Sequence, residues 1–210
     1  SSDGSTESRP AATQYRRGHI RVNWTEIAGF VTGAVCVWLV VIRNIWNFPV
    51  GIANYVFFFV LFTQSGLYAD AGLQVIYTGL ALYGWYSWLY GAEDHSALTV
   101  HNPTPPQFIA CLAAVGIIWA AIQFGLHRWT NSTVAGWDAL TTALSLVAQF
   151  MLSRKWIANW WLWIVADLVY IPLYAYKGLW LTAGLYGIFL GMCIVGLIEW
   201  RRARSAPVPA

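Results

Sequence analysis

The sequence predicts an all-α integral membrane protein with seven transmembrane helices. Hydrophobic residues make up 58% of the 210-residue chain and charged residues only 10%, whereas soluble domains carry charge on about 25% of their residues. So few charges cannot cover that much apolar surface in water. The apolar residues form continuous runs rather than the alternating segments of about ten residues that build membrane β-barrels, so we expect helical spans.

Seven apolar runs approach the roughly 20 residues that a helix needs to cross the hydrocarbon core of a bilayer. They occupy residues 24–42, 46–62, 68–90, 106–126, 134–152, 156–176 and 180–199. A seven-helix domain therefore covers residues 22–200. Residues 1–21 are rich in Ser, Thr and Arg and lack an apolar core, so we expect a disordered N-terminal tail. Residues 201–210 read as a basic, Pro- and Ala-containing C-terminal tail.

Charge, cysteine spacing and motifs exclude several classes of protein. The basic residues behind the net charge of +3 are dispersed or lie at the two ends, so we expect no nucleic-acid partner. The four histidines do not cluster, and Cys36, Cys111 and Cys193 have unrelated spacings. We therefore predict buried, reduced cysteines and no metal site. The chain has no G-x-x-x-x-G-K-[ST], H-E-x-x-H or G-x-S-x-G motif, which argues against an enzyme, a cofactor or ATP-driven transport.

An internal repeat relates the two halves of the chain. A shift of 112 residues lays residues 46–88 on 158–200, and the same shift pairs Asn47/Asn159, Arg43/Lys155, Glu26/Asp138, Gly66/Gly178 and Gly72/Gly184. The pattern predicts a 3+1+3 arrangement: three helices (24–90), a linking helix (106–126) and three helices in the same orientation (134–200). Parallel repeats occur in transporters that bind substrate between the halves near mid-membrane. The alternative is an inert duplicated bundle.

Polar side chains inside the spans are candidates for function, because they are costly in lipid unless they find partners. The sixth span places Asn159, Trp163, Asp167 and Tyr170 on one helical face, since their spacings are 4, 4 and 3 residues. Asp167 is the only acid near the middle of a span, so this face should point inward. The alternative is that Asp167 only hydrogen-bonds neighbouring helices and locks the bundle.

Three other spans add polar candidates. Asn47 and Asn54 share a face of the second span, and Gln74 and Tyr77 form an inward-looking pair in the third. The fifth span carries a polar stripe that consists of Asp138, Thr141, Thr142, Ser145 and Gln149. Gln149 lies deep enough for a ligand contact, whereas the acid near the span end is expected to cap or pair. The hydroxyl residues of the stripe can instead bond only to their own helical turn.

These residues predict a cavity with amides, one carboxylate and an aromatic wall. Amides suit a carboxamide or sugar hydroxyls, and aromatic faces suit a planar ring, more strongly when the ring is cationic. The ligand expected from the residues is a small, flat heterocycle with polar appendages.

Several motifs resemble the signature of the Pnu-type vitamin transporters, most closely their nicotinamide riboside branch. In the second half these are Trp137-Asp138, Leu144-Ser145, Ala148-Gln149, Arg154-Lys155 and Asn159-Trp160 with Trp163. In the first half they are Trp46-Asn47-Phe48-Pro49 with Gly51, Leu67-Tyr68-Ala69, Leu73-Gln74 and Tyr83-Gly84-Trp85-Tyr86-Ser87-Trp88. The resemblance covers about residues 24–200.

The resemblance implies a fold related to the SWEET sugar transporters and a homotrimer in the cell membrane. It implies facilitated diffusion of nicotinamide riboside, a vitamin B3 precursor, into NAD salvage, with trapping by a cytoplasmic riboside kinase. It also implies that Gln149, Asn159 and Trp163 contact the substrate. The C-terminus is placed in the cytoplasm by the resemblance alone, because Lys and Arg are equally numerous on the two sides of the predicted spans.

Two alternatives stay open at this stage. Relatives that carry thiamine or riboflavin share the fold, and both vitamins have flat rings, so another B vitamin could be the substrate. From a different class, the chain could be a membrane binding or assembly subunit that transports nothing.

Overall fold

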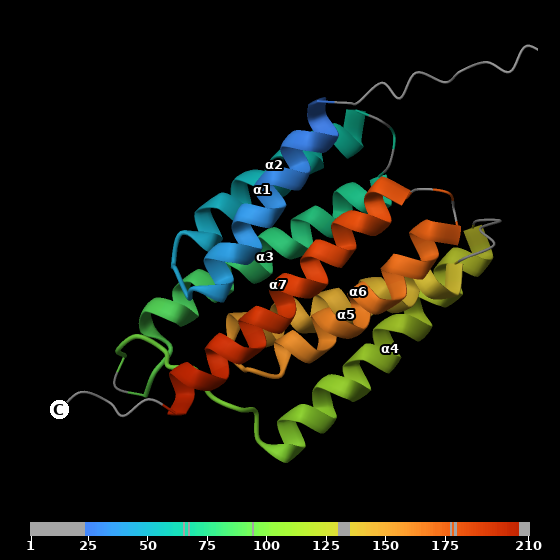
Figure 1. Ribbon diagram of the computed structural model, residues 1–210. Helices are drawn as coiled ribbons and strands as arrows, with labels where there is room; N and C mark the ends of the chain where they lie inside the picture. The colour runs from blue at the N-terminus through green and yellow to red at the C-terminus, as the bar shows by residue number, and fades with distance from the viewer. Residues whose placement is uncertain are drawn as a thin grey trace, which may run out of the picture.

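The computed structural model describes residues 24–64, 66, 68–93, 95–129, 135–176, 178 and 180–205. Within this part of the chain it contains seven α-helices and no strand (Figure 1). They are α1 (Trp24–Val41), α2 (Asn47–Gln64), α3 (Tyr68–Tyr90), α4 (Pro105–Trp129), α5 (Ala135–Ser153), α6 (Asn159–Tyr176) and α7 (Trp180–Ser205). The prediction of seven helices is confirmed. The predicted N-terminal tail lies outside the described residues.

Two helices run three or more residues beyond their predicted ends. α4 continues to Trp129, and α7 continues through the arginine-rich stretch to Ser205, where the sequence predicted the start of a tail. Arginine is a good helix former, and cations in the last turn interact favourably with the negative end of the helix dipole. Arg202 and Arg204 occupy that last turn in α7.

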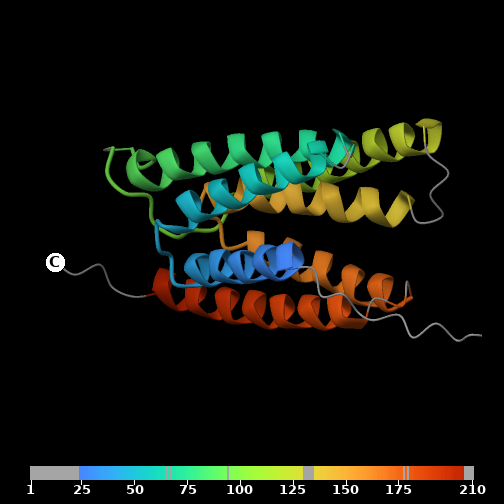
Figure 2. The same cartoon turned by 90° about the horizontal axis from the view of Figure 1, so that it is seen from above.

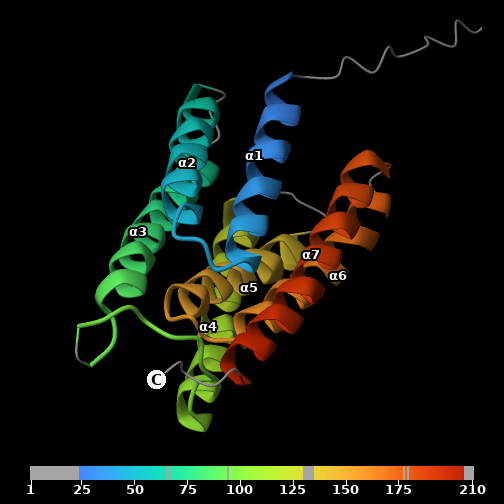
Figure 3. The ribbon, with the colours of Figure 1, turned by 60° about the vertical axis from the view of Figure 1, so that its left-hand side comes forward.

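Six of the helices form a closed ring. In the described residues α1 packs on α2, α2 on α3, α3 on α5, α5 on α6, α6 on α7, and α7 returns to α1. α4 packs only on α5 and so lies outside the ring. Figure 2 shows α1, α6 and α7 on one side of the molecule and the remaining helices on the other, and Figure 3 shows α2 beside α3 and α6 beside α7.

The buried polar side chains of α5 and α6 point into this ring, among apolar ones, and the outward faces of these helices are mainly apolar. Thr141, Ser145 and Gln149 of α5 and Asp167 of α6 are buried, whereas Leu168 is 54% exposed. Three described segments are long and apolar enough to cross a membrane: Asn47–Gln64, Pro105–Gly125 and Thr182–Ser205. Buried polar side chains behind an apolar exterior are the arrangement expected in lipid.

The turns after α1 and α5 have the same unusual geometry. Arg43 and Lys155 adopt left-handed backbone conformations, with φ of 57° and 52°. Their N–H groups donate to Val40 O and Leu152 O, each at 2.9 Å, and the next N–H in each turn reaches back five residues. Both turns are therefore Schellman caps, which satisfy the last carbonyls of each helix. The two left-handed residues are 112 positions apart.

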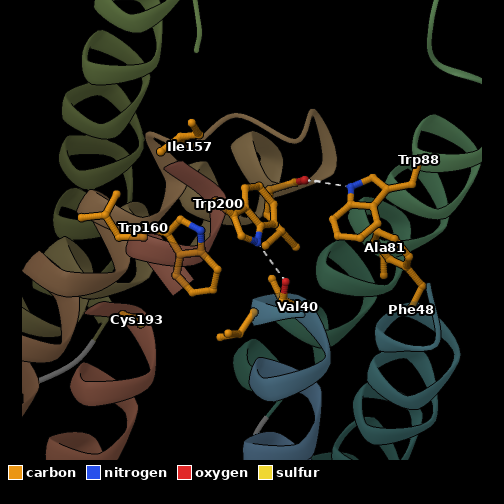
Figure 4. Close-up of a cluster of buried hydrophobic side chains, with 11 residues drawn as sticks. Val40, Phe48, Ala81, Trp88, Ile157, Trp160, Cys193 and Trp200 are labelled. Atoms are coloured by element: carbon orange, nitrogen blue, oxygen red, sulfur yellow. Dashed lines mark hydrogen bonds between the residues drawn. The ribbon is translucent and has the colours of Figure 1, made fainter. Parts of the chain in front are cut away.

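A buried aromatic cluster closes the end of the ring at which α1, α3, α5 and α7 terminate (Figure 4). Trp88 Nε1 donates to Leu152 O and Trp200 Nε1 donates to Val40 O, each at 3.0 Å. Each bond joins a helix of one half to a helix of the other. Phe48 packs edge-on against Trp88 with ring centroids 5.1 Å apart. We call this end the closed end.

Candidate functional site: a polar cavity inside the helix ring

A cavity of about 340 Å³ lies inside the ring and is lined by all six ring helices. Its floor is the closed end, because Val40, Phe48, Leu152 and Trp160 belong to both the buried cluster and the cavity wall. No described residue of α4 lines it. The cavity therefore lies between the two halves of the chain.

Six of the eight binding residues that the sequence predicted lie on this cavity. They are Asn47, Asn54, Gln149, Trp163, Asp167 and Tyr170. They come from α2, α5 and α6, so the ring brings together side chains that lie more than a hundred residues apart. Asn47, Gln149 and Asp167 are each less than a tenth exposed.

The other two predicted residues lie elsewhere. Asn159 is fully buried below the cavity at the start of α6, where Nδ2 donates to Trp156 O at 2.6 Å. Its Oδ1 has no hydrogen-bond partner among the described residues. Asn47 makes the matching bond to Asn44 O at 2.7 Å, but it also lines the cavity. Gln74 is half-buried on α3 and does not line the cavity.

Asp167 supplies the only carboxylate on the described cavity wall. The Cys193 thiol donates to its Oδ2 at 3.5 Å. A thiol is a weak donor, and a carboxylate can accept about four hydrogen bonds. Asp167 therefore keeps capacity to accept hydrogen bonds from a ligand or to offset a positive charge on it.

Tyrosine pairs form two walls of the cavity, one from each half. Tyr55 and Tyr77 stack with ring centroids 5.5 Å apart and planes 22° from parallel. On the opposite half, Tyr170 and Tyr186 lie 4.5 Å apart between centroids. Such faces can hold a planar ring, and they attract a cationic ring most strongly.

Sequence reasoning did not place several lining residues in the site, among them Cys36, Tyr55, Tyr186, Phe189 and Cys193. A signal for the last three was present. Their spacings of 3 and 4 residues put them on one face of α7. Tyr55 likewise lies four residues after a cavity-lining glycine and one after Asn54.

The polar stripe of α5 divides into two groups. Thr141 donates to Trp137 O and Asp138 O, and Thr142 donates to Asp138 O at 2.8 Å. These threonines bond their own helical turn, as the alternative interpretation held. Ser145 and Gln149 instead line the cavity.

The described residues contain no group of three or more His, Cys, Asp or Glu side chains that could hold a metal ion. Cys36, Cys111 and Cys193 are free thiols. The chemistry that the cavity offers is therefore recognition by amides, hydroxyls, aromatic faces and one carboxylate.

Comparison with known proteins gives consistent matches along the chain. A family model described as nicotinamide mononucleotide transporter matches residues 23–202. The nicotinamide riboside transporter PnuC of Escherichia coli is 24% identical over 208 residues and the alignment covers 87% of each chain. The riboflavin/roseoflavin transporter RibM of Streptomyces davaonensis is 26% identical over 191 residues, with 88% and 89% covered. A crystal structure of the vitamin B3 transporter PnuC superposes with a TM-score of 0.65 at 24% identity, covering 86% of this chain and 81% of that one.

Proposed function

Because the chain belongs to the nicotinamide mononucleotide transporter family, we propose that it carries nicotinamide riboside across the membrane. Membership of this family makes it a transporter and not an enzyme. The substrate has a flat cationic ring, a carboxamide and ribose hydroxyls. Amide, carboxylate and tyrosine side chains on one cavity between the halves match these three features.

The observation that carries the choice of substrate is the carboxylate of Asp167 on a cavity with aromatic walls. A charged group buried in a low-dielectric site interacts strongly with an opposite charge. Nicotinamide riboside carries a positive ring, whereas riboflavin is neutral. The riboflavin carrier among the relatives makes riboflavin the second candidate, with thiamine, which is also cationic, as a third.

Uptake into liposomes that contain only this protein tests the proposal. Asp167→Asn keeps the shape and removes the charge, so uptake of nicotinamide riboside should fall at least tenfold, since a hydrogen bond to a charged group contributes about 1.5–3 kcal/mol and 1.4 kcal/mol is tenfold. Riboflavin uptake, if present, should not fall. Asp70→Asn is the matched control, because Asp70 is exposed at the start of α3.

Each other outcome would change the substrate, the role of Asp167 or the class of the protein. Preference of the unmodified protein for riboflavin or thiamine would keep the transporter and change its substrate. Equal loss in both variants would remove the role of Asp167. No flux of any of these vitamins would favour the binding or assembly subunit.

We further propose that the halves are parallel repeats of the 3+1+3 type found in the SWEET transporters. A shift of 112 residues turns the bounds of α2 into those of α6 and the start of α3 into that of α7. The same shift relates the two Schellman caps and the two tryptophan bonds at the closed end. α4, which packs outside the ring, is then the linking helix.

The proposed mechanism is facilitated diffusion, with a cytoplasmic riboside kinase that traps the substrate on the C-terminal side. In empty liposomes, uptake should then stop when the substrate concentration inside equals the concentration outside. Substrate, counted together with its phosphorylated product, should accumulate above the outside concentration only when kinase and ATP are enclosed. We also propose a homotrimer, as the resemblance implies. The mass of the protein in a detergent micelle tests it.

A further inference from the structure

A second pocket lies outside the ring, between α3 and α4, and α5 forms part of its wall. It has a volume of about 450 Å³ and its lining is almost wholly apolar, with Ile76 and Leu80 of α3, Ala114 and Ile118 of α4, and Phe150 of α5 among its residues. It shares no lining residue with the central cavity. We call it the outer groove.

The groove has the depth of one leaflet. Along α4 it extends from Gln107 to Ile118, which is about 16 Å at a rise of 1.5 Å per residue. The hydrocarbon core of a bilayer is about 30 Å thick, so the groove reaches from one membrane boundary to the middle. At its outer end it is bordered by Trp156, in the turn that follows α5.

A positive charge stands at this outer end. The Arg154 guanidinium lies 5.9 Å from the centroid of the Trp156 ring, and its Nη1 donates to Tyr83 Oη at 3.0 Å. Tyr83 in turn stacks on Phe150 with planes 5° from parallel, so the arginine is fixed against the groove wall. Arg154 forms no ion pair within the described part of the chain. Arginine has five N–H donors, and most of them stay available here.

We propose that the outer groove binds one acyl chain of an anionic phospholipid, whose phosphate group is held by Arg154. Water in an apolar groove between lipid-facing helices would find no hydrogen-bond partners. An acyl chain needs none, so it can fill the groove without burying an unpaired polar group. Arginine pairs with phosphate through parallel hydrogen bonds, and basic pockets between membrane helices select anionic headgroups. The Arg154 guanidinium at the outer end of the groove favours an anionic headgroup over an apolar helix of a second copy.

The test is lipid retention by the full-length protein in neutral detergent. Phosphatidylglycerol and phosphatidylcholine with identical acyl chains are added in equal amounts, and bound lipid and thermal stability are measured by native mass spectrometry and thermal unfolding. The unmodified protein should retain phosphatidylglycerol preferentially and be stabilised by it. Equal retention of the two lipids would overturn the proposal without reference to any variant.

Two variants separate the contribution of the lipid headgroup to binding from that of the acyl chain. Arg154→Gln should lower phosphatidylglycerol retention about tenfold, because a charge-assisted hydrogen bond of about 1.5 kcal/mol corresponds to roughly tenfold in affinity. Ala114→Phe fills the groove with the arginine intact, so it should lower retention of both lipids. Arg204→Gln is the matched control, since it removes an exposed charge at the same end of the molecule and should change nothing.

Each contrary result refutes a specific part of the proposal. Equal losses in Arg154→Gln and Arg204→Gln would assign the effect to general surface charge. A change of oligomer mass in Ala114→Phe without a change in bound lipid would place a second copy of the chain in the groove. Nicotinamide riboside uptake by Ala114→Phe in phosphatidylcholine liposomes reports that the variant is folded.

Discussion

Replacing Trp200 with phenylalanine tests whether indole hydrogen bonds hold the two halves together at the closed end. Trp200 is fully buried, and its Nε1 donates to Val40 O at 3.0 Å. The variant loses this bond, which contributes about 1 kcal/mol. The carbonyl is not left unpaired, because the Arg43 N–H also donates to it at 2.9 Å. The smaller ring leaves a void that costs about 1 kcal/mol more, so we expect a loss of about 2 kcal/mol.

The assay is reversible unfolding in mixed micelles, with the free energy of unfolding measured for both single variants and the double variant. Trp88→Phe should cost a similar amount, because Leu152 O likewise keeps the Lys155 N–H. The two indole rings lie 5.9 Å apart between centroids, so the single losses should not add, with a coupling energy of at least about 0.5 kcal/mol.

The control for this experiment is Trp119→Phe in α4. Its indole also donates to a backbone carbonyl, Gly136 O at 3.2 Å, but Trp119 is 41% exposed, so the smaller ring leaves no buried void there. We expect a change below about 0.5 kcal/mol. If Trp200→Phe destabilised the protein no more than Trp119→Phe, neither the indole hydrogen bond nor the volume filled by the larger ring would contribute to the stability of the closed end.

Three further predictions concern other parts of the molecule. Gly196→Ala should lower the free energy of unfolding by about 1–3 kcal/mol, because its methyl group would collide with the buried indole ring of Trp160. Gly191→Ala is the control, since its methyl group meets open space and should be tolerated; thermal unfolding measures both variants. Burial and a neighbouring arginine lower the pKa of Lys155 to about 8. The unfolded state therefore binds more protons between about pH 8 and 10.5, and stability should rise with pH in that window, a slope that Lys155→Met should abolish. Cys36 and Cys193 line the cavity, so nicotinamide riboside should slow their alkylation, as read by mass spectrometry; unchanged rates would place the ligand elsewhere.

All helix ends but the last could be predicted to within three residues because lipid imposes one simple rule on sequence. A span needs a continuous apolar run, and polar connections then mark its ends. The rule fails where a helix leaves the hydrocarbon, as α7 does after Trp200. In water or among headgroups, arginine continues a helix as well as leucine does. Hydropathy therefore locates the membrane boundary, and the helix end is a separate property.

Helical periodicity predicts which face of a helix points inward but not how deep each residue lies. On α6 the predicted face is correct, since Trp163, Asp167 and Tyr170 all line the cavity. Asn159 shares that face but begins the helix, so it lies below the cavity floor and bonds the preceding turn. Its contact with a ligand stays a prediction. One tyrosine of each wall, Tyr77 and Tyr170, was predicted to face inward, but its partner, Tyr55 or Tyr186, was missed. Spacing alone does not separate a membrane-interface aromatic from one that lines a cavity.

The proposed repeat is conserved in structure where the halves join and divergent where a ligand would lie. At the closed end the 112-residue shift maps Trp88 on Trp200 and one hydrogen bond on the other. In the cavity the same shift places Asp167 opposite Tyr55 and Gln149 opposite Val37, although all four residues line it. A two-fold ring with identical walls would favour a ligand with two identical ends. The substrate proposed above has a charged ring at one end and a sugar at the other, and a carboxylate that lines the cavity from one half only matches this asymmetry.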